Sequence, residues 1–93
     1  MLISHSVDAA TLHVTLHHSI DVHTRAAVAE EIEALVHTHR PRRVNVQVPA
    51  GEPTPATLSV VVRAHRMCKG LDIPLSLTGA TTAAQRLFTA NTA

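Results

Sequence analysis

The chain has 93 residues, which suits one domain over residues 1–93 that removes about 60% of its unfolded surface from water. Eight Lys and Arg balance seven Asp and Glu to a formal charge of +1, so neither nucleic acid nor an anionic membrane is expected as a partner. Cys68 is the only cysteine, which excludes an intrachain disulfide. The N-terminal segment has no continuous apolar run of signal or membrane length, and we expect a cytoplasmic protein.

The chain begins with two predicted strands. Residues 11–18, "TLHVTLHH", alternate apolar and polar side chains, the period of a half-buried strand. A shorter strand at residues 2–6 is expected to pair with it through a turn at residues 8–10. We therefore expect an opening hairpin.

A helix is predicted next, over residues 24–39. Its apolar residues recur at helical spacing: Val28, Ile32, Leu35 and Val36. It should end before Pro41, with His37 and His39 at the negative end of the helix dipole. Residues 43–48, "RVNVQV", alternate again and predict a third strand.

The second predicted helix has a clear start, because Thr54 can cap it and Pro55 suits its first position. We expect it to end at Gly70. The stripe expected to face inward consists of Leu58, Val61, Val62 and His65. The stripe expected to face solvent consists of Arg63, Arg66 and Lys69.

The last two elements are a strand at residues 73–77, with Pro74 at its beginning or at a sheet edge, and a short helix. Thr82 and Gln85 form a capping box for this helix, and Leu87 and Phe88 are its expected anchors. The order β-β-α-β-α-β-α predicts an α/β sandwich. It would have a mixed, mostly parallel sheet of about four strands and three helices.

Residues 11–90 resemble, in order and spacing, the STAS domain of bacterial anti-sigma factor antagonists. Residues 19–22, "SIDV", are similar to the family's Gly-Glu-Leu-Asp-Leu turn, and residues 62–66, "VRAHR", to the end of its second main helix. The resemblance is a diffuse pattern and contains no invariant motif. It implies a STAS-like fold and a non-catalytic module that binds an anti-sigma factor or kinase-like regulator.

The chain departs from this family at the phosphorylated turn. The family's turn reads Asp-Ser-Ser-Gly-Leu-Gly, and an ATP-dependent anti-sigma kinase phosphorylates the serine after the aspartate. The resemblance places Thr54 at the aspartate, Pro55 at that serine, Ala56 at the second serine and Thr57 at the glycine. Since proline has no hydroxyl, we expect the switch to be lost, unless a local shift makes Thr54, Thr57 or Ser59 the phosphoacceptor.

The predicted partner-binding surface surrounds this turn. Its residues are Asp21, Val22, His23, Pro53, Thr54, Pro55, Ala56, Thr57, Leu58 and Arg63. By sequence, Asp21 is also a capping residue for the first long helix, and the start of the second helix should offer unpaired amides to a carboxylate or phosphate. Two alternatives stay open: a domain that binds a small anionic ligand there, and a homodimer formed through an edge strand.

No catalytic, cofactor or metal site is predicted. His13 and His17 share a strand face, but no ligand spacing completes a metal site, so both are expected as surface histidines. His65 is expected to be buried and hydrogen-bonded, and Cys68 to be a buried, inert thiol. The three glycines are not clustered, which excludes a phosphate-binding glycine loop and, together with the inert thiol, predicts that the chain is not an enzyme.

Overall fold

The computed structural model describes residues 3–17, 20–49 and 54–92. The predicted order of elements is confirmed, and the boundaries lie within two residues of the expected ones wherever a range was predicted. The strands are β1 (Ile3–Asp8), β2 (Thr11–Leu16), β3 (Arg43–Gln47) and β4 (Leu75–Thr78). The helices are α1 (Arg25–His39), α2 (Pro55–Gly70) and α3 (Thr82–Thr92).

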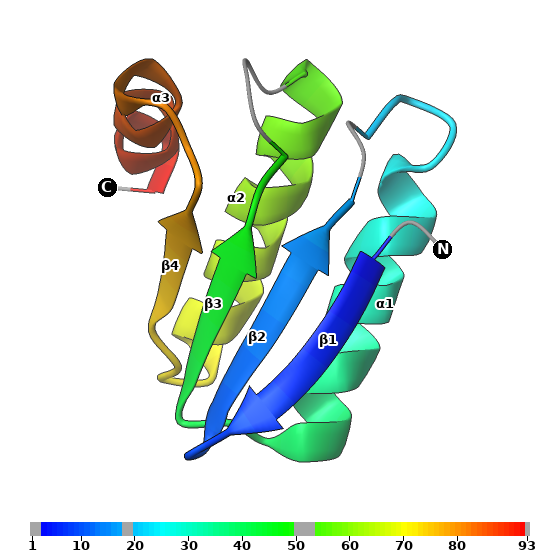
Figure 1. The fold of residues 1–93 in the computed structure, drawn as a ribbon, viewed down its shortest axis with the longest axis vertical. Coiled ribbons are helices and arrows are strands. Elements are labelled where there is room, and N and C mark those ends of the chain that lie inside the picture. The colour runs from blue at the N-terminus through cyan, green and yellow to red at the C-terminus, as the bar shows by residue number, and fades with distance from the viewer. Residues whose placement is uncertain (1–2, 18–19, 50–53, 93) are drawn as a thin grey trace.

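The four strands form one mixed sheet in the order β1-β2-β3-β4, as the predicted fold class requires (Figure 1). β1 pairs antiparallel with β2, while β2, β3 and β4 run parallel. The register places Val14 opposite Val46, so the valines of neighbouring strands share a face. Pro74 directly precedes β4 at the edge of the sheet, and its carbonyl accepts a hydrogen bond from the Val44 amide at 2.9 Å.

The core lies between the sheet and the helices. α1 and α2 cover one face of the sheet, and α3 packs against α2 beside β4 (Figure 1). No described helix covers the other face, which carries polar side chains such as Thr11, His13 and Asn45. Most side chains of the core are aliphatic, as expected for a chain with one aromatic residue. Its largest fully buried members are Ile3, Leu12, Val14, Leu16, Ile20, Val28, Ile32, Val36, Val44, Val46, Val60 and Val61.

The expected inward stripe of α2 was largely wrong. The buried residues are Thr57, Val60, Val61, Ala64 and Cys68. Of the predicted stripe, Val61 is buried, whereas Leu58, Val62 and His65 are half-buried on the flank of the helix. The apolar residues from 58 to 62 fit two overlapping helical stripes. The stripe that is buried contains Thr57 and Ala64, whose small side chains allow α2 to approach its neighbours.

The expected start and anchor of α3 also need correction. The Thr81 hydroxyl, and not that of Thr82, accepts the hydrogen bond that caps the helix, from the Ala84 amide at 3.1 Å. The capping box predicted with Gln85 therefore does not form. Phe88 is buried as predicted, but Leu87 is 51% exposed because the next helical position faces about 100° away.

The hairpin turn consists of Ala9 and Ala10, with Asp8 belonging to β1. Their φ angles of 50° and 64° lie in the left-handed region, as a two-residue type I′ turn requires. This conformation favours Asn and Gly and is costly for residues with a Cβ. The turn is therefore a position where the sequence does not provide the most stable residues.

Candidate functional site

The start of α2 follows the prediction. Thr54 has an extended backbone, and its side-chain oxygen accepts a hydrogen bond from the Thr57 amide at 3.1 Å, while Pro55 occupies the first helical position. Pro55 is exposed. The position that corresponds by resemblance to the family's phosphorylated serine is therefore a solvent-facing proline ring at the first turn of a helix.

Two threonine hydroxyls tie this helix start to the segment before α1. The Ile20 amide donates to Thr57 Oγ1 at 2.9 Å, and Thr54 Oγ1 donates to the Ile20 carbonyl. The two hydroxyl oxygens are 2.9 Å apart, and because the single proton of Thr54 goes to Ile20, Thr57 is the donor between them. We call these three residues the Ile20 clamp.

Sequence reasoning did not find the Ile20 clamp. Thr57 is 1% exposed. Its hydroxyl accepts a hydrogen bond from the buried Ile20 amide and donates one to Thr54, so these buried polar groups are paired. The available signal was a threonine within an apolar helical stripe, three residues after a capping threonine. A buried hydroxyl at such a position needs a partner, but the sequence does not identify Ile20 as that partner.

Asp21 stabilises the turn that leads into α1. Its Oδ1 accepts hydrogen bonds from the amides of His23 at 2.8 Å and Thr24 at 3.0 Å. The bond from the Thr24 amide is the main cause that lowers the pKa of Asp21 below its ordinary value. Thr24 occupies the N-cap position without a side-chain capping bond, so Asp21 acts one turn earlier than a capping residue would.

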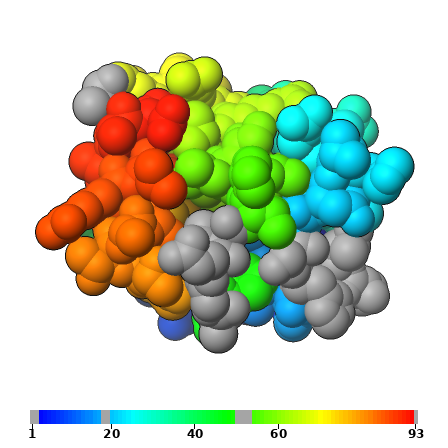
Figure 2. Space-filling view, turned by 90° about the horizontal axis from the view of Figure 1, so that it is seen from above, coloured from blue at the N-terminus to red at the C-terminus, as the bar shows by residue number. Residues whose placement is uncertain are grey.

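The starts of α1 and α2 lie side by side on one end of the molecule (Figure 2). Two hollows at this end are both lined by Pro55. The α1–α2 hollow has a volume of about 380 Å³ and is lined by Ile20, Asp21, Val22, Arg25, Thr54, Pro55 and Ala56. The α2–α3 hollow has a volume of about 520 Å³ and is lined by Pro55, Leu58, Ser59, Val62, Arg63, Arg66 and Asn91. Pro55 belongs to both hollows, so they form one continuous surface.

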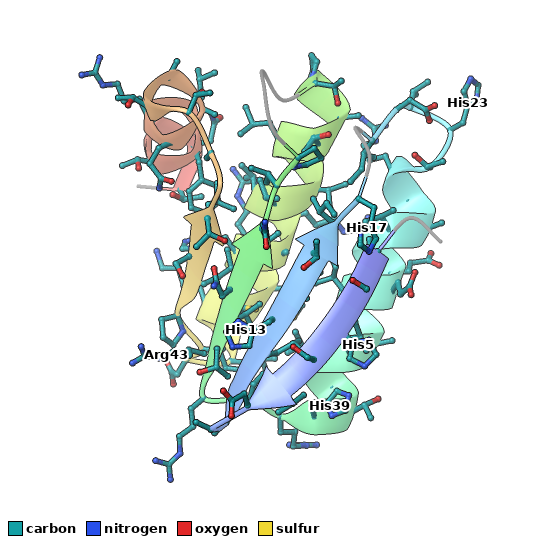
Figure 3. All side chains as sticks on the ribbon, in the orientation of Figure 1. His5, His13, His17, His23, His39 and Arg43 are labelled. Carbon is teal, nitrogen blue, oxygen red and sulfur yellow. The ribbon has the colours of Figure 1, made fainter. Side chains whose placement is uncertain are left out.

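Most of the predicted partner-binding residues lie on this surface. Thr57 is buried beneath it, and Pro53 lies outside the described residues. His23 is exposed and projects from the loop before α1, outside the lining of both hollows (Figure 3). Arg25, Val62, Arg66 and Asn91 were not predicted and come from helix faces that the folded chain places beside Pro55.

The start of α2 is capped by the chain's own Thr54 side chain, contrary to the expected row of unpaired amides. In α2, Pro55 has no N–H, Thr57 donates to Thr54, and the Leu58 amide donates to the Thr54 carbonyl. This leaves at most the Ala56 amide for an external anion. Before α1, the Asp21 carboxylate accepts hydrogen bonds from the His23 and Thr24 amides, and α1 itself starts without a side-chain capping bond.

The remaining candidate residues are Cys68 and His65. Cys68 is buried, and burial raises the pKa of its thiol to about 11, which disfavours the nucleophilic thiolate. His65 is half-buried, its ring meets Phe88 edge-on at 5.5 Å, and its Nδ1 has no hydrogen-bond partner, which corrects the expected hydrogen-bonded histidine. Within the described residues, no group of three or more His, Cys, Asp or Glu side chains is placed to hold a metal ion.

The chain matches no protein-family model, and no curated protein was found to be similar to it. Among the helices of the described ranges, none has the length and hydropathy needed to cross a membrane.

Proposed function

We propose that the chain is a non-catalytic protein-interaction module of bacterial regulatory signalling, acting in the cytoplasm. In this proposal it binds an anti-sigma factor or a related kinase-like regulator, as its resemblance to STAS domains implies. The observation that carries the proposal is the position of Pro55, exposed between two hollows at the starts of α1 and α2.

The chemistry of this surface suits a protein partner. Val22 is 66% exposed, and Leu58 and Val62 are half-buried, so apolar side chains are available as contacts. Arg63 and Arg66 line one hollow and Arg25 the other. Arginine next to apolar contacts is common in protein interfaces, and these guanidinium groups would favour a partner that carries carboxylates.

A small anionic ligand is a weaker alternative on the same surface. A phosphate site at a helix start depends on free backbone amides, and the Thr54 cap and Pro55 leave few of them at the start of α2. The arginine side chains remain, but they are divided between two open hollows, with Arg63 and Arg66 in one and Arg25 in the other. The surface therefore favours a protein over an isolated phosphate or carboxylate.

The three candidate phosphoacceptors differ in accessibility. Thr57 is buried, and a phosphate there would replace the hydroxyl proton that Thr57 donates to Thr54. Thr54 is half-buried and holds the Ile20 carbonyl, whereas Ser59 is exposed in the α2–α3 hollow, one helical turn before Arg63. We therefore infer that binding does not depend on a phosphate at the position of Pro55, and that a phosphate, where one occurs, is on Ser59 and close to Arg63.

The test is affinity capture of the tagged chain in its source bacterium, followed by mass spectrometry. The same run identifies the captured proteins and the phosphorylation state of the peptide from Pro49 to Arg63. Arg63→Glu reverses a charge on the proposed surface, and Leu58→Asp places a carboxylate among its apolar contacts. Arg86→Glu is the matched control, because Arg86 is an exposed arginine on α3 that lines neither hollow.

We expect the wild-type chain and Arg86→Glu to retain an ATPase-like anti-sigma partner, and Arg63→Glu and Leu58→Asp to lose it. Retention by all four proteins would contradict the proposed surface. Capture without any anti-sigma or kinase-like regulator would contradict the proposed partner class. A phosphate on Thr54 or Thr57 would contradict the assignment of the phosphate to Ser59.

A further inference from the structure

The structure brings together two histidines that are distant in sequence. His5 on β1 and His39 in the last turn of α1 are 34 residues apart, and their ring centres lie 5.6 Å apart with the planes tilted by 45°. Both side chains are exposed, on the side of β1 that faces α1 (Figure 3). From sequence, His39 was expected only at the negative end of the helix dipole.

We propose that His5 and His39 form a two-histidine site for a divalent metal ion of the Cu²⁺, Ni²⁺ and Zn²⁺ group. Imidazole nitrogen is a favourable ligand for these ions. The site lies on the other end of α1 from the proposed docking surface, and it is independent of that function.

The separation of the rings suits one shared metal ion. A metal–nitrogen bond of about 2.0–2.1 Å places the ion about 3.2 Å from the centre of each ring. Two ring centres 5.6 Å apart then subtend roughly 120° at the ion, close to the angle between ligands in a tetrahedral or trigonal site. Small rotations of two exposed side chains can direct one nitrogen of each ring to this point.

Two other histidines already have polar neighbours. His17 Nε2 is hydrogen-bonded to Ser4 Oγ at 2.8 Å, and His37 Nε2 lies 3.9 Å from Glu33 Oε1. Within the described residues, no such hydrogen bond or ion pair involves His5 or His39. Their nitrogens are therefore available without the loss of an existing side-chain bond.

The two ligands come from separate elements, so a bound ion would connect the edge strand β1 to α1. The remaining coordination positions would hold water, since no third His, Cys, Asp or Glu of the described residues joins the pair. Such a site should follow the Irving–Williams order and bind Cu²⁺ more tightly than Ni²⁺ or Zn²⁺.

The experiment is a titration of the ¹⁵N-labelled full chain with CuCl₂, followed by NMR, and with NiCl₂ and ZnCl₂, followed by calorimetry. Paramagnetic broadening by Cu²⁺ is expected first at amides near residues 5 and 39. His5→Ala and His39→Ala should each weaken binding at this site by more than about tenfold, since even loss of an outer-shell partner commonly costs 10–100-fold. The double variant His13→Ala/His17→Ala is the matched control, since it removes two histidines from another part of the chain.

The spectra of the metal-free variants show whether each is folded, and His5→Gln provides a second, polar replacement. The proposal is overturned when broadening begins elsewhere, when His5→Ala, His5→Gln and His39→Ala bind as the wild type does, or when the control alone abolishes binding. A loss confined to variants of His5 and His39 establishes the site. NMR is preferred to thermal stability here because eight histidines allow the unfolded chain to bind these ions as well.

Discussion

Replacing Thr57 by valine tests the Ile20 clamp. Valine has nearly the shape of threonine but lacks the hydroxyl, so the Ile20 amide loses its acceptor at 2.9 Å while it stays buried. The Thr54 hydroxyl loses its 2.9 Å bond to Thr57 in the same variant. The substitution therefore removes the polar contacts of one buried side chain and leaves its volume almost unchanged.

The cost can be worked from these contacts. A buried amide left without a partner costs about 1–3 kcal/mol, and the additional buried methyl of valine returns at most about 0.8 kcal/mol. We expect a net loss of about 1.5 kcal/mol in the free energy of unfolding. For a domain of this length, that corresponds to a fall of about 6–12 °C in Tm.

The assay is urea unfolding followed by circular dichroism, with Thr89→Val as the matched control. The Thr89 hydroxyl donates to the Gln85 carbonyl of its own helix at an exposed position, and its loss should cost less than about 0.5 kcal/mol. Equal losses for Thr57→Val and Thr89→Val would refute the reasoning about the clamp. A lower urea midpoint with an unchanged m-value, the slope of the free energy of unfolding against urea concentration, would show that the substitution changes stability alone.

Three further predictions concern other parts of the fold. Ala10→Gly should raise the free energy of unfolding by about 0.4–1 kcal/mol, because glycine adopts a φ of 64° without strain; an unchanged or lower urea midpoint would contradict the turn geometry. Phe88→Ala should cost about 3–5 kcal/mol and Leu87→Ala less than about 0.5 kcal/mol in the same assay, and similar losses would mean that α3 does not pack through Phe88. Because the pKa of Asp21 is lowered by folding, its carboxylate stabilises the fold above the pKa of the unfolded chain, and this contribution is lost as pH falls through the folded pKa. The stability difference between the wild type and Asp21→Asn should therefore be present at pH 7 and vanish in acid, and a difference that persists in acid would contradict it.

The order of elements and the sheet could be predicted because each strand and helix has its own periodicity. β2 alternates strictly between buried and less buried side chains, and the start of α2 combines a capping threonine with a proline. The face of α2 could not be predicted, because apolar residues occupy neighbouring positions and the choice between stripes depends on which elements the helix contacts. Leu87 and Phe88 present the same ambiguity in α3.

The candidate site was predictable as a region but not as a set of contacts. Asp21, Thr54 and Pro55 have local signals, and the structure places all three in the α1–α2 hollow. The contributions of Arg25 and Asn91 depend on the packing of α1 and α3 against α2, which no local pattern contains. The same limit applies to His5 and His39, which meet only because β1 lies beside the end of α1.

The Ile20 clamp bears directly on how the proposed docking surface could be regulated. It connects the segment before α1 to the first turn of α2, and these two elements supply the lining of the α1–α2 hollow. A phosphate on Thr54 or Thr57 would remove a clamp hydroxyl, so it would disturb the surface itself as well as its charge. A phosphate on the exposed Ser59 would leave the clamp intact and change only the charge beside Arg63. The phosphomimetic Ser59→Asp should therefore alter partner binding without a loss of stability, whereas any replacement of Thr57 that removes its hydroxyl should alter both.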